Sequence, residues 1–157
     1  VERPAAPEPR RLPTLALNGL DADAGRATPP VAGRLAAGFG KGEGVFSRGW
    51  LYAAPTGAED FAPYDGRVAY AGPFRGYGMV ALIDHGGGYH SLLTGLGRVD
   101  VVAGDLVLQG EPLGALPDGR TAGIGAGASE QGGAKLYVEL RKDGEPVDPA
   151  PWFARPT

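Results

Sequence analysis

A run of alternating apolar and polar residues near the C-terminal end constrains the fold more than any other feature of this sequence. Residues 135–141 read Lys-Leu-Tyr-Val-Glu-Leu-Arg, in which every second side chain is aliphatic, as in a β-strand with one buried face. Residues 142–145 read Lys-Asp-Gly-Glu, and Asp-Gly suits the positive φ angles of a tight turn. The sequence therefore predicts a hairpin, with Tyr137, Glu139 and Arg141 on one surface of its first strand.

Glycine and proline are too frequent for long helices. The 157 residues include 28 glycines and 15 prolines and only 21% charged residues, which favours short strands joined by turns. Strands are expected at 50–55, 67–71, 79–84, 89–93, 99–102, 106–108 and 112–116. Residues 119–133 contain six glycines and are expected to form a flexible loop before the C-terminal hairpin. The expected class is mainly β, an antiparallel sheet domain with little helix.

Residues 1–30 differ in composition from the rest of the chain. They hold six of the 15 prolines together with many alanines and arginines, a composition typical of a linker or tail. From residue 31 onward, short apolar runs alternate with turn residues, so one domain is expected over residues 31–157. Because the first residue is Val1 rather than Met, we expect a processed or truncated chain.

Charge and cysteine content exclude several kinds of partner and site. The net charge is -3 and no long basic run occurs, which argues against a nucleic-acid partner or an anionic membrane surface. The absence of cysteine excludes disulfides and thiolate metal sites. No apolar run approaches the ~18 residues of a membrane span, so no membrane insertion is expected.

The two histidines raise the question of a metal site. His85 and His90 flank a Gly-Gly-Gly segment that predicts a hairpin, and their spacing places them on opposite faces. A zinc site would also need carboxylate partners, so a structural His85 and an exposed His90 are preferred. His85 and the three glycines also resemble the oxyanion-hole motif of esterases, but the Gly-x-Ser-x-Gly elbow of those enzymes is missing.

Seven segments together resemble the LytM, or lysostaphin-type, peptidoglycan endopeptidase domain. They are residues 49–57, 62–68, 76–78, 83–89, 104–107, 136–141 and 147–149, and they follow the order and spacing of that family. The resemblance covers roughly Val31 to Phe153. It implies the LytM fold, a duplicated-hybrid-motif-like antiparallel β-sheet domain.

The positions that hold zinc or act in catalysis in active LytM members carry other residues here. By the resemblance, Ser47 stands for the first ligand histidine and Leu51 for the ligand aspartate of His-x-x-x-Asp. Lys135 and Tyr137 stand for the catalytic and the ligand histidine of His-x-His, and Gly95 for another catalytic histidine. Leucine cannot coordinate a metal, so we expect no metal, no cofactor and no hydrolysis by a metal-activated water.

This loss of ligands is similar to the degenerate LytM domains of EnvC-type murein hydrolase activators. Those domains bind and switch on periplasmic N-acetylmuramoyl-L-alanine amidases during cell division, and the resemblance implies that the vacated cleft becomes the amidase-binding groove. Its expected contact residues are Arg48, Leu51, Tyr77, Val80, Tyr137 and Arg141. Tyrosine and arginine around an apolar floor are residue types that dominate protein–protein hot spots.

The resemblance also implies a place of action. It implies a periplasmic location, a role in septal peptidoglycan splitting, and a contact with the division-site ABC-transporter-like complex through upstream regions. Two alternatives stay open. One is a peptidoglycan-binding module without an activator role, and the other is a residual zinc endopeptidase that uses His85 or His90.

Overall fold

Eleven strands make up the part of the chain that the structure describes. The computed structural model describes residues 27–41, 47–118, 133–150 and 152–153. In chain order the strands are β1 (Arg34–Ala37), β2 (Trp50–Pro55), β3 (Glu59–Phe61), β4 (Gly66–Phe74), β5 (Gly78–Gly86), β6 (Tyr89–Leu96), β7 (Arg98–Val99), β8 (Leu106–Val107), β9 (Pro112–Ala115), β10 (Gly133–Lys142) and β11 (Glu145–Val147). These described ranges form no α-helix, and they contain no helix long and apolar enough to cross a membrane.

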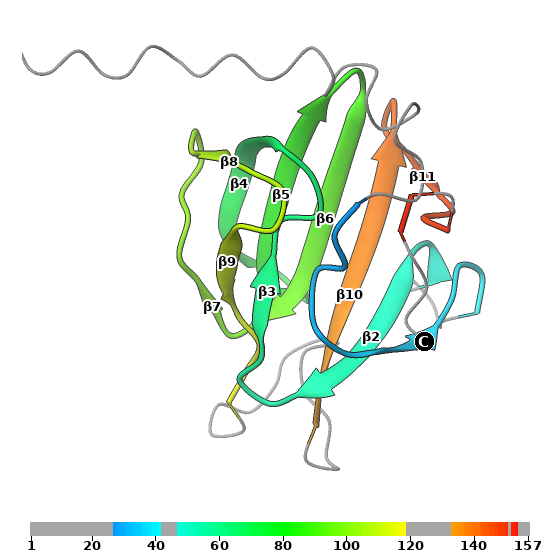
Figure 1. Ribbon diagram of the computed structural model, residues 1–157, viewed down its shortest axis with the longest axis vertical. Helices are drawn as coiled ribbons and strands as arrows, with labels where there is room; N and C mark the ends of the chain where they lie inside the picture. The colour runs from blue at the N-terminus through cyan, green and yellow to red at the C-terminus, as the bar shows by residue number, and fades with distance from the viewer. Residues whose placement is uncertain (1–26, 42–46, 119–132, 151, 154–157) are drawn as a thin grey trace, which may run out of the picture.

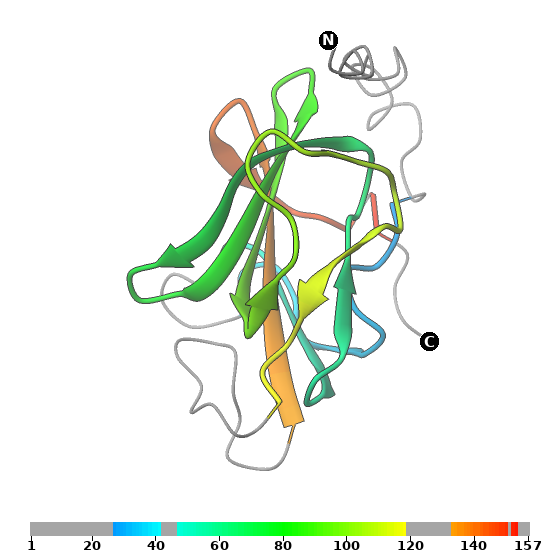
Figure 2. The ribbon, with the colours of Figure 1, turned by 90° about the vertical axis from the view of Figure 1, so that its left-hand side faces the viewer.

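The strands form two antiparallel sheets (Figure 1). The large sheet has the order β1-β2-β10-β6-β5-β4-β8, with β11 paired to the end of β10, and the small sheet has the order β3-β9-β7. Figure 2 shows the small sheet on one side of the large sheet and the β4–β5 hairpin projecting toward the other side. We call the face of the large sheet toward the small sheet its inner face and the opposite face its outer face.

Strand β10 lies in the middle of the large sheet and is hydrogen-bonded to β2 on one side and to β6 on the other. Tyr137 is thereby paired with Leu51 and with Thr94. Paired residues lie on the same face, and successive residues of a strand alternate between faces. This register places Leu136 and Val138 on the inner face and Tyr137, Glu139 and Arg141 on the outer face, as the sequence predicts.

The core fills the space between the inner face and the small sheet. Its buried members come from both sheets and include Trp50, Tyr52, Val68, Ala81, Ile83, Leu93, Leu113, Leu136 and Val138. Burial of each larger side chain stabilises the fold by roughly 1.5–3 kcal/mol. A slip of β10 by one residue would exchange its two faces, so the core fixes the register.

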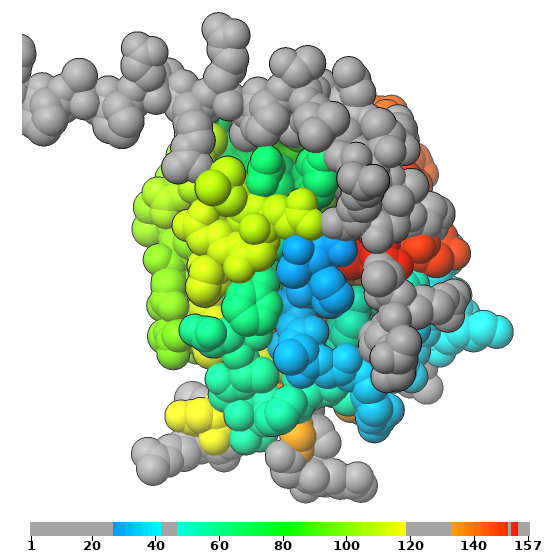
Figure 3. All heavy atoms as spheres, in the orientation of Figure 1, coloured from blue at the N-terminus to red at the C-terminus, as the bar shows by residue number. Residues whose placement is uncertain are grey.

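The described segment before β1 packs on the domain. Ala27 forms a bridge with Phe153, and Val31 forms one with Asp60 of β3. Figure 3 shows this segment in blue beside β3. Residues 27–30 belong to the predicted linker, and the predicted domain boundary at residue 31 stays a prediction.

One carboxyl group lies inside the core. Asp60 is fully buried, and neither of its carboxylate oxygens has a hydrogen-bond partner among the described residues. Burial raises the pKa of Asp60 to about 7, because the charged form is disfavoured away from water. The folded protein therefore holds this proton up to a higher pH than the unfolded chain, and the contribution of Asp60 to stability falls as the pH rises from about 4 to 7.

The strands and turns expected from the sequence are largely present. The hairpin at residues 86–88 is confirmed, and the turn after β10 has φ angles of 52° at Asp143 and 84° at Gly144. The strand expected at 99–102 is present only as β7, which ends at Val99, because the carboxylate of Asp105 accepts a hydrogen bond from the Val102 N–H and closes a turn after it. Strands β1 and β3 were not expected, and residues 119–132 of the predicted flexible loop lie outside the described residues.

Gly49 tests the close packing of β2 against β10. A Cβ atom at this position would overlap the carbonyl oxygen of Val138, whereas a Cβ atom at Gly38 would meet nothing within 4 Å. We expect Gly49→Ala to lower the free energy of unfolding by about 1–3 kcal/mol, because the two strands must move apart. The matched variant Gly38→Ala is expected to leave it unchanged or raise it by up to about 1 kcal/mol. Urea unfolding of both variants measures the difference, and equal stabilities would contradict the packing.

Candidate functional site

A groove of about 930 Å³ lies on the outer face of the large sheet. Its lining combines an apolar floor, aromatic rings and two arginines: Arg48, Tyr70, Phe74, Tyr77, Val80, Leu82, Leu92, Thr94, Glu139, Arg141 and Pro146. Strands β5 and β6 supply the floor, where Val80 is paired with Thr94 and Leu82 with Leu92. The sheet register therefore brings the floor residues together, because paired residues share one face.

One side of the groove is an aromatic wall made of Tyr70, Phe74 and Tyr77. These residues belong to the β4–β5 hairpin, which projects to the outer side of the large sheet (Figure 2). The ring centroid of Phe74 lies 6.3 Å from that of Tyr70 and 5.7 Å from that of Tyr77. Phe74 is 55% exposed and Tyr70 is 40% exposed. Exposed rings that continue an apolar floor form a surface suited to contact with another molecule.

A polar network of Tyr137, Glu139 and Arg141 runs along the outer face of β10. The Tyr137 hydroxyl donates a hydrogen bond to Glu139 Oε1 over 2.9 Å, and Arg141 Nη1 donates to Glu139 Oε2 over 2.6 Å. Arg141 Nη2 also donates to the Gly144 carbonyl oxygen over 2.7 Å. The Glu139 side chain is 8% exposed and that of Arg141 is 34% exposed, so the network passes from the interior to the groove.

Tyr137 is the buried end of this network. Its side chain is 1% exposed, and the backbone N–H of Arg48 is hydrogen-bonded to its hydroxyl group. Burial, the charge of Glu139 and the hydrogen bond to Glu139 raise the pKa of Tyr137 above its usual range. The phenol is therefore a neutral hydrogen-bond donor at any physiological pH.

The structure places four of the six expected groove residues in the lining, namely Arg48, Tyr77, Val80 and Arg141. Tyr137 lies beneath the surface, and its partner Leu51 on β2 is half-buried outside the lining. The assignment of these six residues as contacts with a partner stays a prediction.

Sequence reasoning missed the other lining residues, which are Tyr70, Phe74, Leu82, Leu92, Thr94, Glu139 and Pro146. A signal was present for two of them. Leu82 follows Val80 by two positions in one strand, and Glu139 lies between Tyr137 and Arg141 in the alternating run. Residues of β4 and β6 gave no such signal, because their place in the groove depends on pairing between distant segments.

The five positions expected to be vacated do not fit a metal ion. Leu51 and Tyr137 are paired neighbours, and Gly95 follows Thr94, which is also paired with Tyr137. Leucine and glycine side chains offer no donor atom to zinc, and the Tyr137 hydroxyl is bonded to Glu139. Lys135 lies two positions before Tyr137, and Ser47 precedes β2. Within the described residues, no group of three or more His, Asp or Glu side chains is placed to hold a metal.

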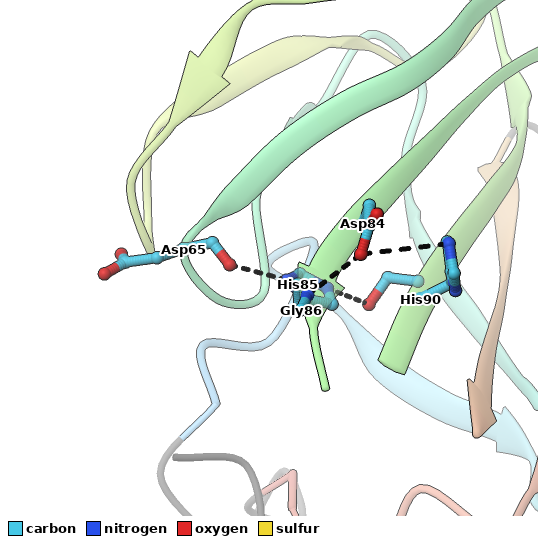
Figure 4. Close-up of polar contacts among 6 residues, drawn as sticks. Asp65, Asp84, His85, Gly86 and His90 are labelled. Carbon is cyan, nitrogen blue, oxygen red and sulfur yellow. Dashed lines mark hydrogen bonds and ion pairs between the residues drawn. The ribbon is translucent and has the colours of Figure 1, made fainter. Parts of the chain in front are cut away.

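The two histidines lie on opposite faces of the β5–β6 hairpin (Figure 4). His85 is fully buried, its Nδ1 lies 2.7 Å from the Asp65 carbonyl oxygen, and its Nε2 lies 2.7 Å from Ser91 Oγ. Because a carbonyl oxygen only accepts, Nδ1 carries the proton and the Ser91 hydroxyl donates to Nε2. His90 is half-buried, not exposed as expected, and its Nε2 lies 3.9 Å from Asp84 Oδ1. The structural role predicted for His85 matches this geometry.

The two antiparallel sheets match the fold of the LytM family, and sequence comparison agrees. Peptidase family M23 matches residues 45–149, so this chain belongs to peptidase family M23. The catalytic domain of the prophage-encoded M23 protein EnpA from Enterococcus faecalis has a similar structure. Its TM-score is 0.62 at 26% identity, and the match covers 82% of this chain and 95% of that one. The mainly β LytM fold expected from the sequence is confirmed.

Two relatives of this chain are longer proteins. The chain is 35% identical over 140 residues to the murein hydrolase activator EnvC of Escherichia coli, a match that covers 87% of this chain and 31% of that protein. It is 33% identical over 134 residues to the cell division protein DipM of Caulobacter vibrioides, which covers 80% of this chain and 20% of that protein. This chain therefore spans less than a third of the length of either relative.

The buried imidazole predicts a pH dependence of stability. Burial lowers the pKa of His85 to about 4, so between about pH 4 and 6.5 the unfolded chain binds a proton that the folded protein does not. The contribution of His85 to stability is complete above pH 6.5 and is lost as the pH falls toward 4. We expect the free energy of unfolding of the wild type, relative to His85→Gln, to fall by about 3 kcal/mol between pH 7 and pH 4.

Urea unfolding of both proteins across this range measures the change. Asp60 is present in both proteins, so its opposite pH dependence cancels in the comparison. A difference that stays constant from pH 7 to pH 4 would show that the folded protein accommodates the protonated imidazole.

Proposed function

We propose that this domain binds a periplasmic N-acetylmuramoyl-L-alanine amidase and activates it for septal peptidoglycan splitting in cell division. The observation that carries the proposal is the groove, in which an apolar floor lies between an aromatic wall and two arginines. The names of two relatives support it, since one is a murein hydrolase activator and the other a cell division protein. The periplasmic location belongs to the same proposal.

The proposal assigns no catalysis to the domain itself. Leu51 and Gly95 have no side-chain atom that can coordinate a metal, and Tyr137 is a neutral phenol that is hydrogen-bonded to Glu139. His85 faces the core and cannot reach a substrate in the groove. These features support a binding role more than a residual endopeptidase, in which a metal-activated water would attack a peptide bond.

The chemistry of the groove defines the kind of segment that it takes. Val80, Leu82 and Leu92 offer apolar contact, and the exposed ring of Phe74 extends that surface. Arg141 presents a guanidinium group to the groove and can pair with a carboxylate in a forked geometry. The partner segment is therefore amphipathic, with an apolar face toward the floor and acidic residues toward the arginines.

Activation by binding requires a difference in affinity. The domain must bind the active conformation of the amidase more tightly than the inactive one, because a ligand shifts a conformational equilibrium only by its differential affinity. A tenfold shift of the equilibrium needs about 1.4 kcal/mol of such preference. One well-placed apolar contact or one arginine–carboxylate pair contributes that much.

The direct test is release of dye from labelled sacculi by a periplasmic amidase, with and without this chain. The expected result is faster release with the chain present and no release by the chain alone, with or without added zinc. Zinc-dependent release by the chain alone would instead identify a residual endopeptidase. Retention of the chain on sacculi without any effect on the amidase would identify a peptidoglycan-binding module.

Arg141 provides the matched mutational test. We expect Arg141→Ala to weaken amidase binding and activation roughly tenfold or more, because it removes a guanidinium group that lines the groove. Arg98→Ala is the control, since Arg98 also forms an ion pair, with Asp100 at 2.9 Å, but lies exposed on β7 of the small sheet. Dye release and calorimetric titration report both variants. Normal activation by Arg141→Ala would contradict the role of the groove.

A further inference from the structure

Glu139 is a buried carboxylate on the groove side of β10. Its side chain is 8% exposed, and its neighbour across the sheet is Leu92 of β6. A carboxylate in such surroundings is costly unless its charge is paired and its oxygens accept hydrogen bonds. Both conditions are met, because Oε1 accepts from Tyr137 and Oε2 from Arg141.

Arg141 is held at two points by acceptors on either side. Nη1 donates to Glu139 and Nη2 donates to the Gly144 carbonyl oxygen in the β10–β11 turn. The residue still lines the groove, and about one third of its side chain is exposed. The guanidinium group is therefore fixed in orientation while one part of it faces the groove. Without Glu139, one of these two anchors is lost and the long side chain regains rotational freedom.

The other oxygen of Glu139 connects to the second arginine of the groove. The Tyr137 hydroxyl that donates to Oε1 is also bonded to the backbone N–H of Arg48. Arg48 lies just before β2 and lines the groove. One carboxylate thus holds the side chain of Arg141 directly and the main chain of Arg48 through Tyr137.

We infer that Glu139 is the positioning residue of the groove: its carboxylate fixes the Arg141 guanidinium and the Arg48 backbone in the arrangement that receives a partner's carboxylate. This inference rests on the proposed function, because it assumes a partner that uses the groove. A side chain that is already ordered loses less freedom on binding, so positioning raises affinity without a contact of its own. Glu139 lines the groove, but its side chain is only 8% exposed and both of its oxygens already accept hydrogen bonds within the chain.

The direction in which Glu139→Gln changes the binding affinity separates positioning from simple charge balance. Glu139→Gln removes a negative charge from the groove while keeping the shape of the side chain. If Glu139 only offset the charge of Arg141, its neutralisation would strengthen the binding of an acidic segment. If Glu139 positions Arg141, binding weakens, and we expect a loss of roughly two- to tenfold.

A double-mutant cycle shows whether the effect passes through Arg141. Amidase binding is measured for the wild type, Glu139→Gln, Arg141→Ala and the double variant. We expect Glu139→Gln to have a smaller effect once Arg141 is alanine, because no guanidinium group is left to position and only the link to Arg48 through Tyr137 remains. A loss of the same size in both backgrounds would overturn the inference and leave Glu139 with a purely structural role.

A second readout uses the free chain and does not depend on the amidase. In nitrogen-15 NMR spectra, the guanidinium signals of Arg141 in the wild type should show restricted rotation, and those of Glu139→Gln should show faster rotation, because only the Gly144 anchor remains. Tyr137→Phe removes only the hydroxyl group and should leave the rotation of Arg141 restricted. If Glu139→Gln does not fold, Tyr137→Phe takes its place in the binding assay. In that case a loss with Tyr137→Phe supports positioning through Arg48, and unchanged binding overturns it.

The two readouts also distinguish the two proposals. If the wild type does not bind the amidase, the proposed function fails whatever the NMR spectra show. If it binds and the Arg141 signals are equally mobile in the wild type and in Glu139→Gln, the positioning role of Glu139 fails alone.

Discussion

The pairing of β10 with β2 on one side and with β6 on the other is the constraint on which the rest of the structure depends. The backbone hydrogen bonds fix which residues lie opposite one another, and the aliphatic residues Leu136 and Val138 fix which face is buried. Tyr137, Glu139 and Arg141 must then share the outer face, where Leu51, Thr94 and Leu92 are their neighbours. The groove is therefore a consequence of the same register that forms the core.

The sequence predicts the fold well where local patterns act alone. Alternation along residues 135–141 and the Asp-Gly turn were sufficient for β10 and its hairpin, whereas β3 has only three residues and depends on pairing with β9. In the site, Arg48, Tyr77, Val80 and Arg141 were expected in the lining, but Phe74 was not, because its place depends on how far a hairpin projects. The burial of Tyr137 was also missed, since alternation predicts a shared face and does not predict what covers it.

Polar contacts on the outer face of β10 join side chains that line the groove. One ion pair and two hydrogen bonds converge on Glu139 and Arg141. A buried ion pair contributes little net stability, because the cost of removing both charges from water offsets most of their attraction. Its effect is geometric, and it uses only side-chain and backbone groups of the chain itself, so the arrangement is complete as soon as the chain has folded.

The β4–β5 hairpin has a further consequence. Its base contributes Val68 and Ile83 to the core, but Phe74 at its far end is mostly exposed, and Gly76 and Gly78 close the turn with φ angles of 83° and 75°. Substitutions at positions 70 and 74 change the shape of the aromatic wall without reaching the core. Related chains can therefore diverge in what they recognise while keeping one scaffold, because recognition and folding draw on separate parts of the same hairpin.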